Sequence, residues 1–388
     1  MPADWPPQSD GPRKRARELG LEFGPHPTAE NNAITDVAGV RVGQVTVIEG
    51  DSVRTGVTAI VPDAVDLARG SLPAGLFVGN GYGKLIGATQ LAELGEIESP
   101  VVLTGTLSAF RAADALLTYV LRLPGNEGLT SANPVVGETN DGYLSDIRAR
   151  PVTEQHVLSA LATAGAGPVA EGAVGAGTGT SALGFKAGIG TASRVLALGD
   201  DRTATLAEGR TARLGESRTA TLGVLVQANF SGVLTVRGVR ISAPHEPRDA
   251  QPAGERHPGA AAAAVGGDAG DPAGGNSCMI VVATDLGLDS RQLTRVARRA
   301  VFAMGRTGAD FAHGSGDYAI AFSTVSEPRM ADAGLNPVFG AVQDAVEEAI
   351  LNSVFMATTT IGYLGRIKHA VPLHVVTSAC RAAGVVGD

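Results

Sequence analysis

The spacing of apolar residues along the chain predicts a mixture of strands and helices. Residues 34–48 alternate apolar with polar positions, which predicts a pair of half-buried strands joined by a glycine turn. Apolar runs predict further strands at 57–61, 74–78, 100–103, 223–230, 232–241, 279–283 and 318–323. Helical spacing predicts helices at 84–94, 109–123, 152–164, 290–304, 337–354 and around 357–363. Because these elements come in runs instead of strict alternation, a layered α+β protein is favoured over a doubly wound sheet.

Three segments depart from this pattern. The composition of residues 1–27 predicts a flexible leader that ends in a short, solvated basic helix around 13–17. Residues 201–222 repeat the motif RTATLAEG with variations, and their alternating Thr and Leu predict a hairpin-like insertion at the surface. Residues 244–276 are rich in Ala, Gly, Pro and Asp, which predicts a disordered loop. The rest of 28–388 is expected to form a single domain.

Charge and composition argue against several classes of protein. The net charge is -8 and there is no basic stripe, so a nucleic-acid partner is not expected. The histidines and cysteines lack the HExxH and CxxC spacings of metal sites, so neither a metal nor another cofactor is expected. No secretory signal and no apolar run of membrane length occurs, which favours a cytoplasmic enzyme that does not bind membranes.

The glycine-rich stretches do not carry a known nucleotide motif. Residues 79–84 and 175–180 lack the G-x-x-x-x-G-K-[ST] pattern of a phosphate-binding loop, and their match to a dinucleotide fingerprint is weak. These glycines favour close approach of backbone to backbone or to a small substrate. The G-x-S-x-G elbow of many serine hydrolases is also absent, since Ser315 in HGSGD stands in a different frame.

Ser277 lies where the loop-like segment ends and an apolar strand begins, in the stretch GGNSCMIVVATD. A serine hydroxyl is a weak nucleophile unless a base takes its proton. Cutting the preceding peptide bond would give Ser277 an α-amine, whose pKa of about 7.7–8.0 suits it to be that base. Spacing alone favours the plainer interpretation, in which Ser277 is an ordinary strand-start residue.

The sequence from Arg15 to about Leu373 resembles the DmpA/BapA family of self-processing aminopeptidases, peptidase family S58. The blocks that carry the resemblance are RARELGL, NAITDVAGVRVGQ, GLFVGNGYGKLIG, VGETNDGYLSDI, GAVGAGTGTSALGFKAGIGTASR, GVLVQANFSG, NSCMIVVATD and GADFAHGSGDYAIAFST. This resemblance implies a four-layer αββα sandwich like that of the N-terminal nucleophile hydrolases. It also implies cleavage between Asn276 and Ser277, giving an α chain of residues 1–276 and a β chain of residues 277–388 that stay together.

The resemblance also implies roles for the residues around the nucleophile. Ser315 and Asp317 match the family's helper pair, and residues i and i+2 of a strand share a face. Asp317 stands where the family can have glutamate, and the plainer interpretation is an acid that caps a turn. Asn229 matches the asparagine that stabilises the oxyanion, with a strand-end asparagine in a turn as the alternative.

Substrate binding is implied by the block VGETNDGYL. Glu138 matches an acid that holds the substrate's ammonium group, and either Asn140 or Tyr143 matches a second oxyanion donor. The expected substrates are short peptides, amides or esters, and the processed αβ units are expected to form a homo-oligomer. Two alternatives remain: an acyltransferase resembling ornithine acetyltransferase, which uses threonine at the cleavage point, and a non-catalytic binding protein of the same fold.

Overall fold

The structure, a computed structural model, describes residues 11–65, 70–198, 203–205, 211–213, 218–243, 277–327 and 330–387. The loop expected at 244–276, including Asn276, therefore lies outside the described residues, as does the part of the leader before residue 11.

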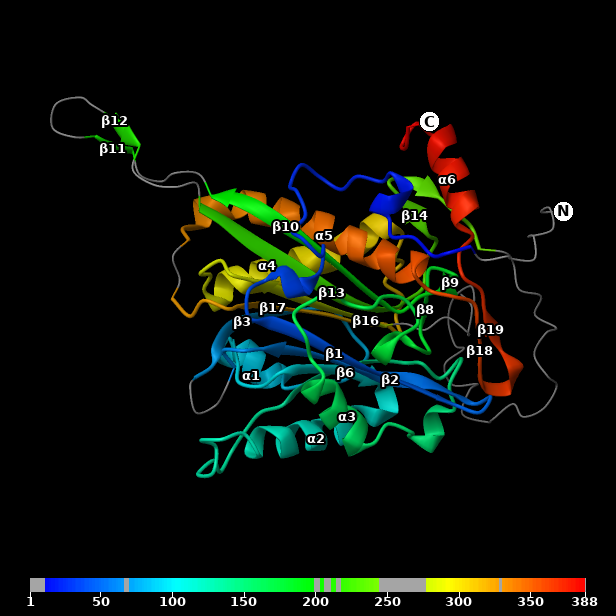
Figure 1. Cartoon of the computed structure of the whole chain (residues 1–388), viewed down its shortest axis with the longest axis horizontal. Coiled ribbons are helices and arrows are strands. Elements are labelled where there is room, and N and C mark those ends of the chain that lie inside the picture. Colours follow the sequence, from blue (N-terminus) through cyan, green and yellow to red (C-terminus); the bar gives the residue numbers. More distant parts are fainter. Residues whose placement is uncertain are drawn as a thin grey trace.

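Two stacked sheets form the middle of the molecule (Figure 1). The five-stranded sheet contains, in spatial order, β1 (Val40–Glu49), β2 (Val53–Pro62), β6 (Val101–Gly105), β7 (Val135–Thr139) and β4 (Leu85–Ile86). The six-stranded sheet contains, in spatial order, β10 (Ile189–Leu198), β13 (Arg218–Asn229), β16 (Ser277–Thr284), β17 (Gly316–Ser323), β3 (Leu72–Gly81) and β5 (Glu96–Ile97).

Helices cover the outer face of each sheet. The six-stranded sheet carries α4 (Ser290–Met304) and α5 (Leu335–Phe355), and the five-stranded sheet carries α2 (Ala109–Leu121) and α3 (Glu154–Ala162). Two further helices, α1 (Ala88–Glu93) and α6 (Leu373–Ala382), lie outside these layers, α1 beside β3. The expected four-layer αββα sandwich of the α+β class is confirmed.

Three apolar clusters lie between the four layers, and β16 contributes to two of them. Cys278, Ile280 and Val282 pack under the helices, whereas Met279 and Val281 alternate with them and pack between the sheets. Every residue of β16 is buried. This is why its sequence is a continuous apolar run, since a strand covered on both faces has no solvated side.

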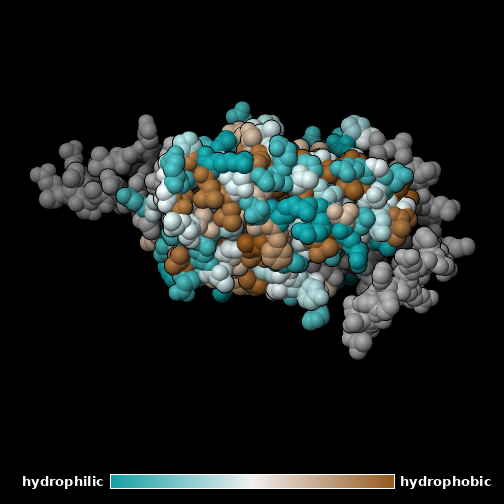
Figure 2. All heavy atoms as spheres, turned by 90° about the horizontal axis from the view of Figure 1, so that it is seen from below, coloured by the Kyte–Doolittle hydropathy of each residue, from teal (hydrophilic) through white to brown (hydrophobic). Residues whose placement is uncertain are grey.

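The surface of the sandwich is mixed in character. Figure 2 views the side of α2 and α3, where hydrophobic residues form small groups among hydrophilic ones. Within the part of the chain that the structure describes, no helix combines the length and the apolar character needed to cross a bilayer.

Several predicted elements have other forms. Residues 34–48 form a 3₁₀ turn at Ile34–Asp36 followed by the single strand β1, not a strand pair. The segment 232–241 forms a separate hairpin of β14 (Thr235–Val236) and β15 (Val239–Arg240) outside the main sheets. The helix expected around 357–363 was wrong, because this segment pairs through β18 (Thr360–Ile361) with β19 (Ile367–Lys368).

Short strands also lie in and beside the predicted insertion at 201–222. β11 (Thr203–Thr205) pairs antiparallel with β12 (Thr211–Arg213). β13 already begins at Arg218 and pairs with β10 from that residue, so residues 218–222 belong to the six-stranded sheet. A further pair, β8 (Ser181–Ala182) and β9 (Phe185–Lys186), lies in the glycine-rich region.

The basic N-terminal segment is anchored to the core, which corrects the expectation of a solvated helix. Only a three-residue 3₁₀ turn forms, at Arg17–Leu19. Arg15 Nε lies 2.7 Å from a carboxylate oxygen of Glu171, and Arg17 Nε lies 3.0 Å from Glu348. Arg15 and Arg17 thus face buried carboxylates and form ion pairs with residues far away in the sequence.

Candidate active site

Ser277 begins β16 in the centre of the six-stranded sheet. Its antiparallel partner on β13 is Asn229, and its parallel partner on β17 is Gly316. The residue is 4% exposed. The three residues predicted to assist the nucleophile therefore lie close to it in the sheet. Asn229 comes from β13, Asp317 from β17, and Ser315 immediately precedes β17.

Ser315 and Asp317 form the predicted pair. The Ser315 hydroxyl donates a 2.7 Å hydrogen bond to Asp317 Oδ1, and both side chains are buried. Burial raises the pKa of Asp317 to about 6, although the Ser315 hydroxyl and the backbone N–H of Cys278 lower it. Asp317 Oδ2 accepts no hydrogen bond from the described residues. An unsatisfied carboxylate oxygen thus lies beside the first peptide unit of β16.

Asn229 is held at both ends of its side-chain amide. Its Oδ1 accepts a 3.1 Å hydrogen bond from the backbone N–H of Ser181, and its Nδ2 donates one of 2.9 Å to the Asn140 carbonyl. An asparagine amide carries two N–H donors. One is used on Asn140, and the second is available for another acceptor.

Asn140 and Tyr143, both predicted to help bind substrate, have different surroundings. The Asn140 side-chain oxygen accepts a 2.9 Å hydrogen bond from the Gly142 N–H, and its backbone carbonyl accepts the one from Asn229. The ring of Tyr143 lies 5.2 Å from the Arg366 guanidinium and 4.9 Å from the Lys368 ammonium.

Glu138 reaches the site from β7, in the other sheet. Its side chain is 3% exposed, and its Oε1 accepts a 2.8 Å hydrogen bond from the backbone N–H of Lys84. Gly83 connects it to the nucleophile's strand partner: a Cβ built on Gly83 would lie 3.3 Å from Glu138 Oε1 and 3.4 Å from Gly316 Cα. A side chain at position 83 would therefore press on both the acid and the strand beside Ser277.

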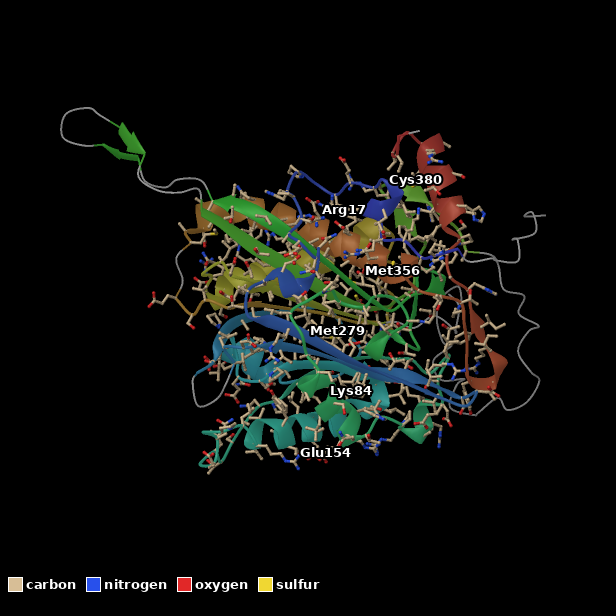
Figure 3. All side chains as sticks on the ribbon, in the orientation of Figure 1. Arg17, Lys84, Glu154, Met279, Met356 and Cys380 are labelled. Carbon is tan, nitrogen blue, oxygen red and sulfur yellow. The ribbon has the colours of Figure 1, made fainter. Side chains whose placement is uncertain are left out.

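The packing between the sheets brings β7 and β16 together. Met279, labelled in Figure 3, belongs to the inter-sheet cluster, and its side chain packs on Gly137 of β7. A Cβ on Gly137 would lie 2.4 Å from Met279 Cε. Because Gly137 has no side chain, the Met279 side chain can pack directly on the backbone of β7.

Three charged residues of this region were not predicted from the sequence. Lys84 pairs with Glu138, and Asp141 and Lys186 are both fully buried beneath the site. Burial raises the pKa of Asp141 to about 6 and lowers that of Lys186 to about 7. The signal for Lys186 was available, since it is the one lysine within the glycine-rich segment 172–190.

A cavity of about 580 Å³ opens beside the Asn229 end of β13. Its lining includes Ser181 and Phe230, of which the first bonds Asn229 and the second follows it in the chain, together with Asp310 and Lys368. In the described part of the chain, no three His, Cys, Asp or Glu residues are grouped as metal ligands would be.

Comparisons with known proteins identify relatives of the whole chain. The chain is 38% identical over 385 residues to the beta-peptidyl aminopeptidase BapA of Sphingosinicella xenopeptidilytica, an alignment that covers 92% of this chain and 89% of that protein.

Two solved structures superpose on nearly the whole chain. The L-aminopeptidase D-Ala-esterase/amidase of Ochrobactrum anthropi, described as a serine aminopeptidase and a variant of the Ntn hydrolase fold, gives a TM-score of 0.78 at 34% identity. The beta-aminopeptidase of a Burkholderia species gives 0.77 at 32% identity. Both alignments cover 96% of this chain and 99% of the other. Because the model of peptidase family S58 also matches residues 32–368, the chain belongs to that family and is a serine aminopeptidase of the Ntn hydrolase fold.

Proposed function

We propose that the chain cleaves itself between Asn276 and Ser277 and that Ser277 then acts as the nucleophile of an aminopeptidase. The observation that carries this proposal is the position of Ser277. It is the first residue of a buried central strand, with Asn229 on one side and the Ser315–Asp317 pair on the other.

Cleavage would create the base that the reaction needs. In the uncut chain the nitrogen of Ser277 is an amide, which cannot take a proton at neutral pH. After cleavage it is an α-amine, which accepts the proton of the Ser277 hydroxyl as that oxygen attacks the substrate carbonyl. The carboxylate of Asp317 stabilises the ammonium so formed, directly or through the Ser315 hydroxyl.

The remaining steps follow ordinary acyl transfer. The free N–H of Asn229 donates to the oxyanion of the tetrahedral intermediate, a contribution of roughly 3 kcal/mol in comparable enzymes. The ammonium of Ser277 passes its proton to the leaving amine, and the C–N bond breaks to give an acyl-enzyme on Ser277. Water, deprotonated by the same amine, then hydrolyses the ester and frees the hydroxyl.

We propose that Glu138 binds the ammonium group of the substrate and so limits the enzyme to N-terminal residues. A buried carboxylate close to the nucleophile's neighbouring strand suits this role. Relatives described as beta-peptidyl aminopeptidases support substrates whose amine is one carbon further from the carbonyl. The substrate class is therefore short α- and β-aminoacyl peptides, amides and esters.

Hydrolysis of paired α- and β-aminoacyl p-nitroanilides tests this function. The wild type should release p-nitroaniline from both classes, and Ser277→Ala should release none. Ser323→Ala is the matched control, because Ser323 ends the neighbouring strand β17 and hydrogen-bonds the Leu286 carbonyl. Transfer of the acyl group to an added amine, without hydrolysis, would favour the acyltransferase alternative and contradict the proposal.

A further inference from the structure

The charge of Glu138 is already compensated in the structure, and the compensating group is Lys84. The Lys84 backbone N–H lies 2.8 Å from Glu138 Oε1, and the Lys84 ammonium lies 3.5 Å from the same oxygen. A buried carboxylate is costly unless it is paired and hydrogen-bonded. Lys84 therefore does in this structure what a substrate ammonium would do during catalysis.

The Lys84 ammonium is held more closely elsewhere. It donates a 2.7 Å hydrogen bond to the Thr106 hydroxyl, whereas 3.5 Å to Glu138 exceeds the 2.7–2.9 Å or so of a charge-assisted hydrogen bond. The Lys84 side chain is also 38% exposed, so solvent reaches part of it. A flexible lysine with a second partner within reach is able to leave Glu138 without losing all of its hydrogen bonds.

The backbone of Lys84, in contrast, is fixed. The Gly83 carbonyl accepts a 3.1 Å hydrogen bond from the Tyr318 hydroxyl, and Lys84 leads directly into β4, which pairs with β7. The hydrogen bond from the Lys84 backbone N–H to Glu138 is therefore kept when the Lys84 side chain moves. Figure 3 labels Lys84 in the half of the molecule that contains the five-stranded sheet, and Glu138 belongs to a strand of that sheet.

We propose that Lys84 is an exchangeable counter-ion that sets how strongly the enzyme selects substrates with a free amine. In the empty site, and with an acyl substrate that lacks an amine, Lys84 neutralises Glu138. A substrate ammonium displaces the Lys84 ammonium towards Thr106 and takes its place. This inference rests on the proposed role of Glu138 and assigns a specificity residue for that function.

The exchange limits amine selectivity because Glu138 never stays unpaired. An amine-free substrate leaves the Glu138–Lys84 pair intact, so binding it does not leave a buried carboxylate unpaired. An ammonium substrate, in contrast, must bind beside the positive charge of Lys84. Without Lys84, only the ammonium substrate would pair the buried carboxylate. Selectivity for the amine should then increase, through weaker binding of the amine-free substrate and tighter binding of the ammonium substrate.

The experiment compares β-alanyl and propionyl p-nitroanilides, which differ only in the amine, on the processed wild type, Lys84→Met and Lys84→Arg. We expect Lys84→Met to raise the ratio of kcat/KM values for the two substrates by about tenfold or more, the scale of one hydrogen bond to a charged group. The change should lie in KM, with kcat for the β-alanyl substrate little altered. Lys84→Arg should stay near the wild-type ratio.

A second variant keeps the inference testable if Lys84→Met does not fold. Thr106→Val removes the alternative partner of the ammonium, so Lys84 should hold Glu138 more firmly and KM for the β-alanyl substrate should rise. An unchanged ratio in a processed Lys84→Met, or an unchanged KM in Thr106→Val, would overturn the inference.

Glu138→Gln separates this inference from the function on which it rests. If this variant keeps the wild-type preference for the amine, the role proposed for Glu138 fails, and the role of Lys84 fails with it. If Glu138→Gln loses the preference while Lys84→Met leaves it unchanged, Glu138 binds the ammonium as proposed and only the counter-ion role is wrong.

Discussion

At the scale of single residues, the site depends on acids that are kept away from water. Asp317 and Asp141 are both buried, and burial raises the pKa of each to about 6. Asp317 adjoins the nucleophile, whereas Asp141 follows Asn140, whose carbonyl holds Asn229. Asp141 Oδ2 accepts no hydrogen bond from the described residues, so ionisation of this group leaves a partly uncompensated charge under the site.

Asp141 should make the stability of the protein depend on pH in the acid range. Its pKa is higher in the folded than in the unfolded chain, so its ionisation weakens the fold as the pH rises from about 4 to about 6. By the shift from 3.8 to about 6, the wild type should lose roughly 2 kcal/mol of unfolding free energy relative to Asp141→Asn over this range. Urea unfolding of both proteins at pH 4, 5 and about 6.5 measures the difference. Parallel pH curves would show that Asp141 is not the group responsible.

At the scale of elements, close backbone packing holds the helical layer on the sheet. Gly190 of β10 lies directly under α5, where an added Cβ would be 1.9 Å from the Ala349 carbonyl oxygen and 2.7 Å from the Ser353 nitrogen. Neither atom belongs to a flexible side chain, so the helix would have to move.

Gly190→Ala should therefore destabilise the protein by about 1–3 kcal/mol or more. Gly340→Ala is the matched control, because Gly340 lies on α5 itself with nothing within 4 Å of the added Cβ. That control should be neutral or stabilising by up to about 1 kcal/mol, as expected for alanine in a helix. Thermal unfolding of both variants measures the contrast. Equal effects would mean that α5 does not depend on this contact.

The sequence predicted those elements whose pattern is set by local burial. The helix at 290–304 has the predicted bounds, because one face of it packs on the sheet and Asp289 caps its start. The N-terminal segment and 357–363 were missed, because their conformations depend on partners outside each segment: Arg17 pairs with Glu348, far away in the sequence, and β18 pairs with β19 across a turn.

The residues of the candidate site also differ in how far the sequence predicted them. Ser277 stood out from the sequence as a serine at a seam between segments, whereas Asn229, Glu138, Ser315 and Asp317 were drawn from resemblance. Their roles stay predictions, although the structure brings all of them to the β16 end of the sandwich. Lys84 could not be predicted, because its pairing with Glu138 depends on β4 lying beside β7.

At the scale of the whole molecule, the two parts separated by the proposed cut meet within the six-stranded sheet and between that sheet and its helices. β16 pairs along its whole length with β13 of the first part, and α4 packs on β3 while α5 packs on β10. The cut parts should therefore stay associated without a covalent link. We also propose, from resemblance, that these αβ units form a homo-oligomer; Val78 and Phe302, both about half exposed on β3 and α4, are apolar groups that such contacts would cover.

Intact mass spectrometry of the purified protein under denaturing conditions tests the central claim most directly, with Ser277→Ala run beside the wild type. We predict two fragments in the wild type, the smaller beginning at Ser277, and one chain of full length in the variant. Native spectra of the same wild-type sample should show the two fragments together. A wild type that hydrolyses aminoacyl amides while remaining one uncut chain near 39.2 kDa would contradict the account, because Ser277 would then have no α-amine to act as its base.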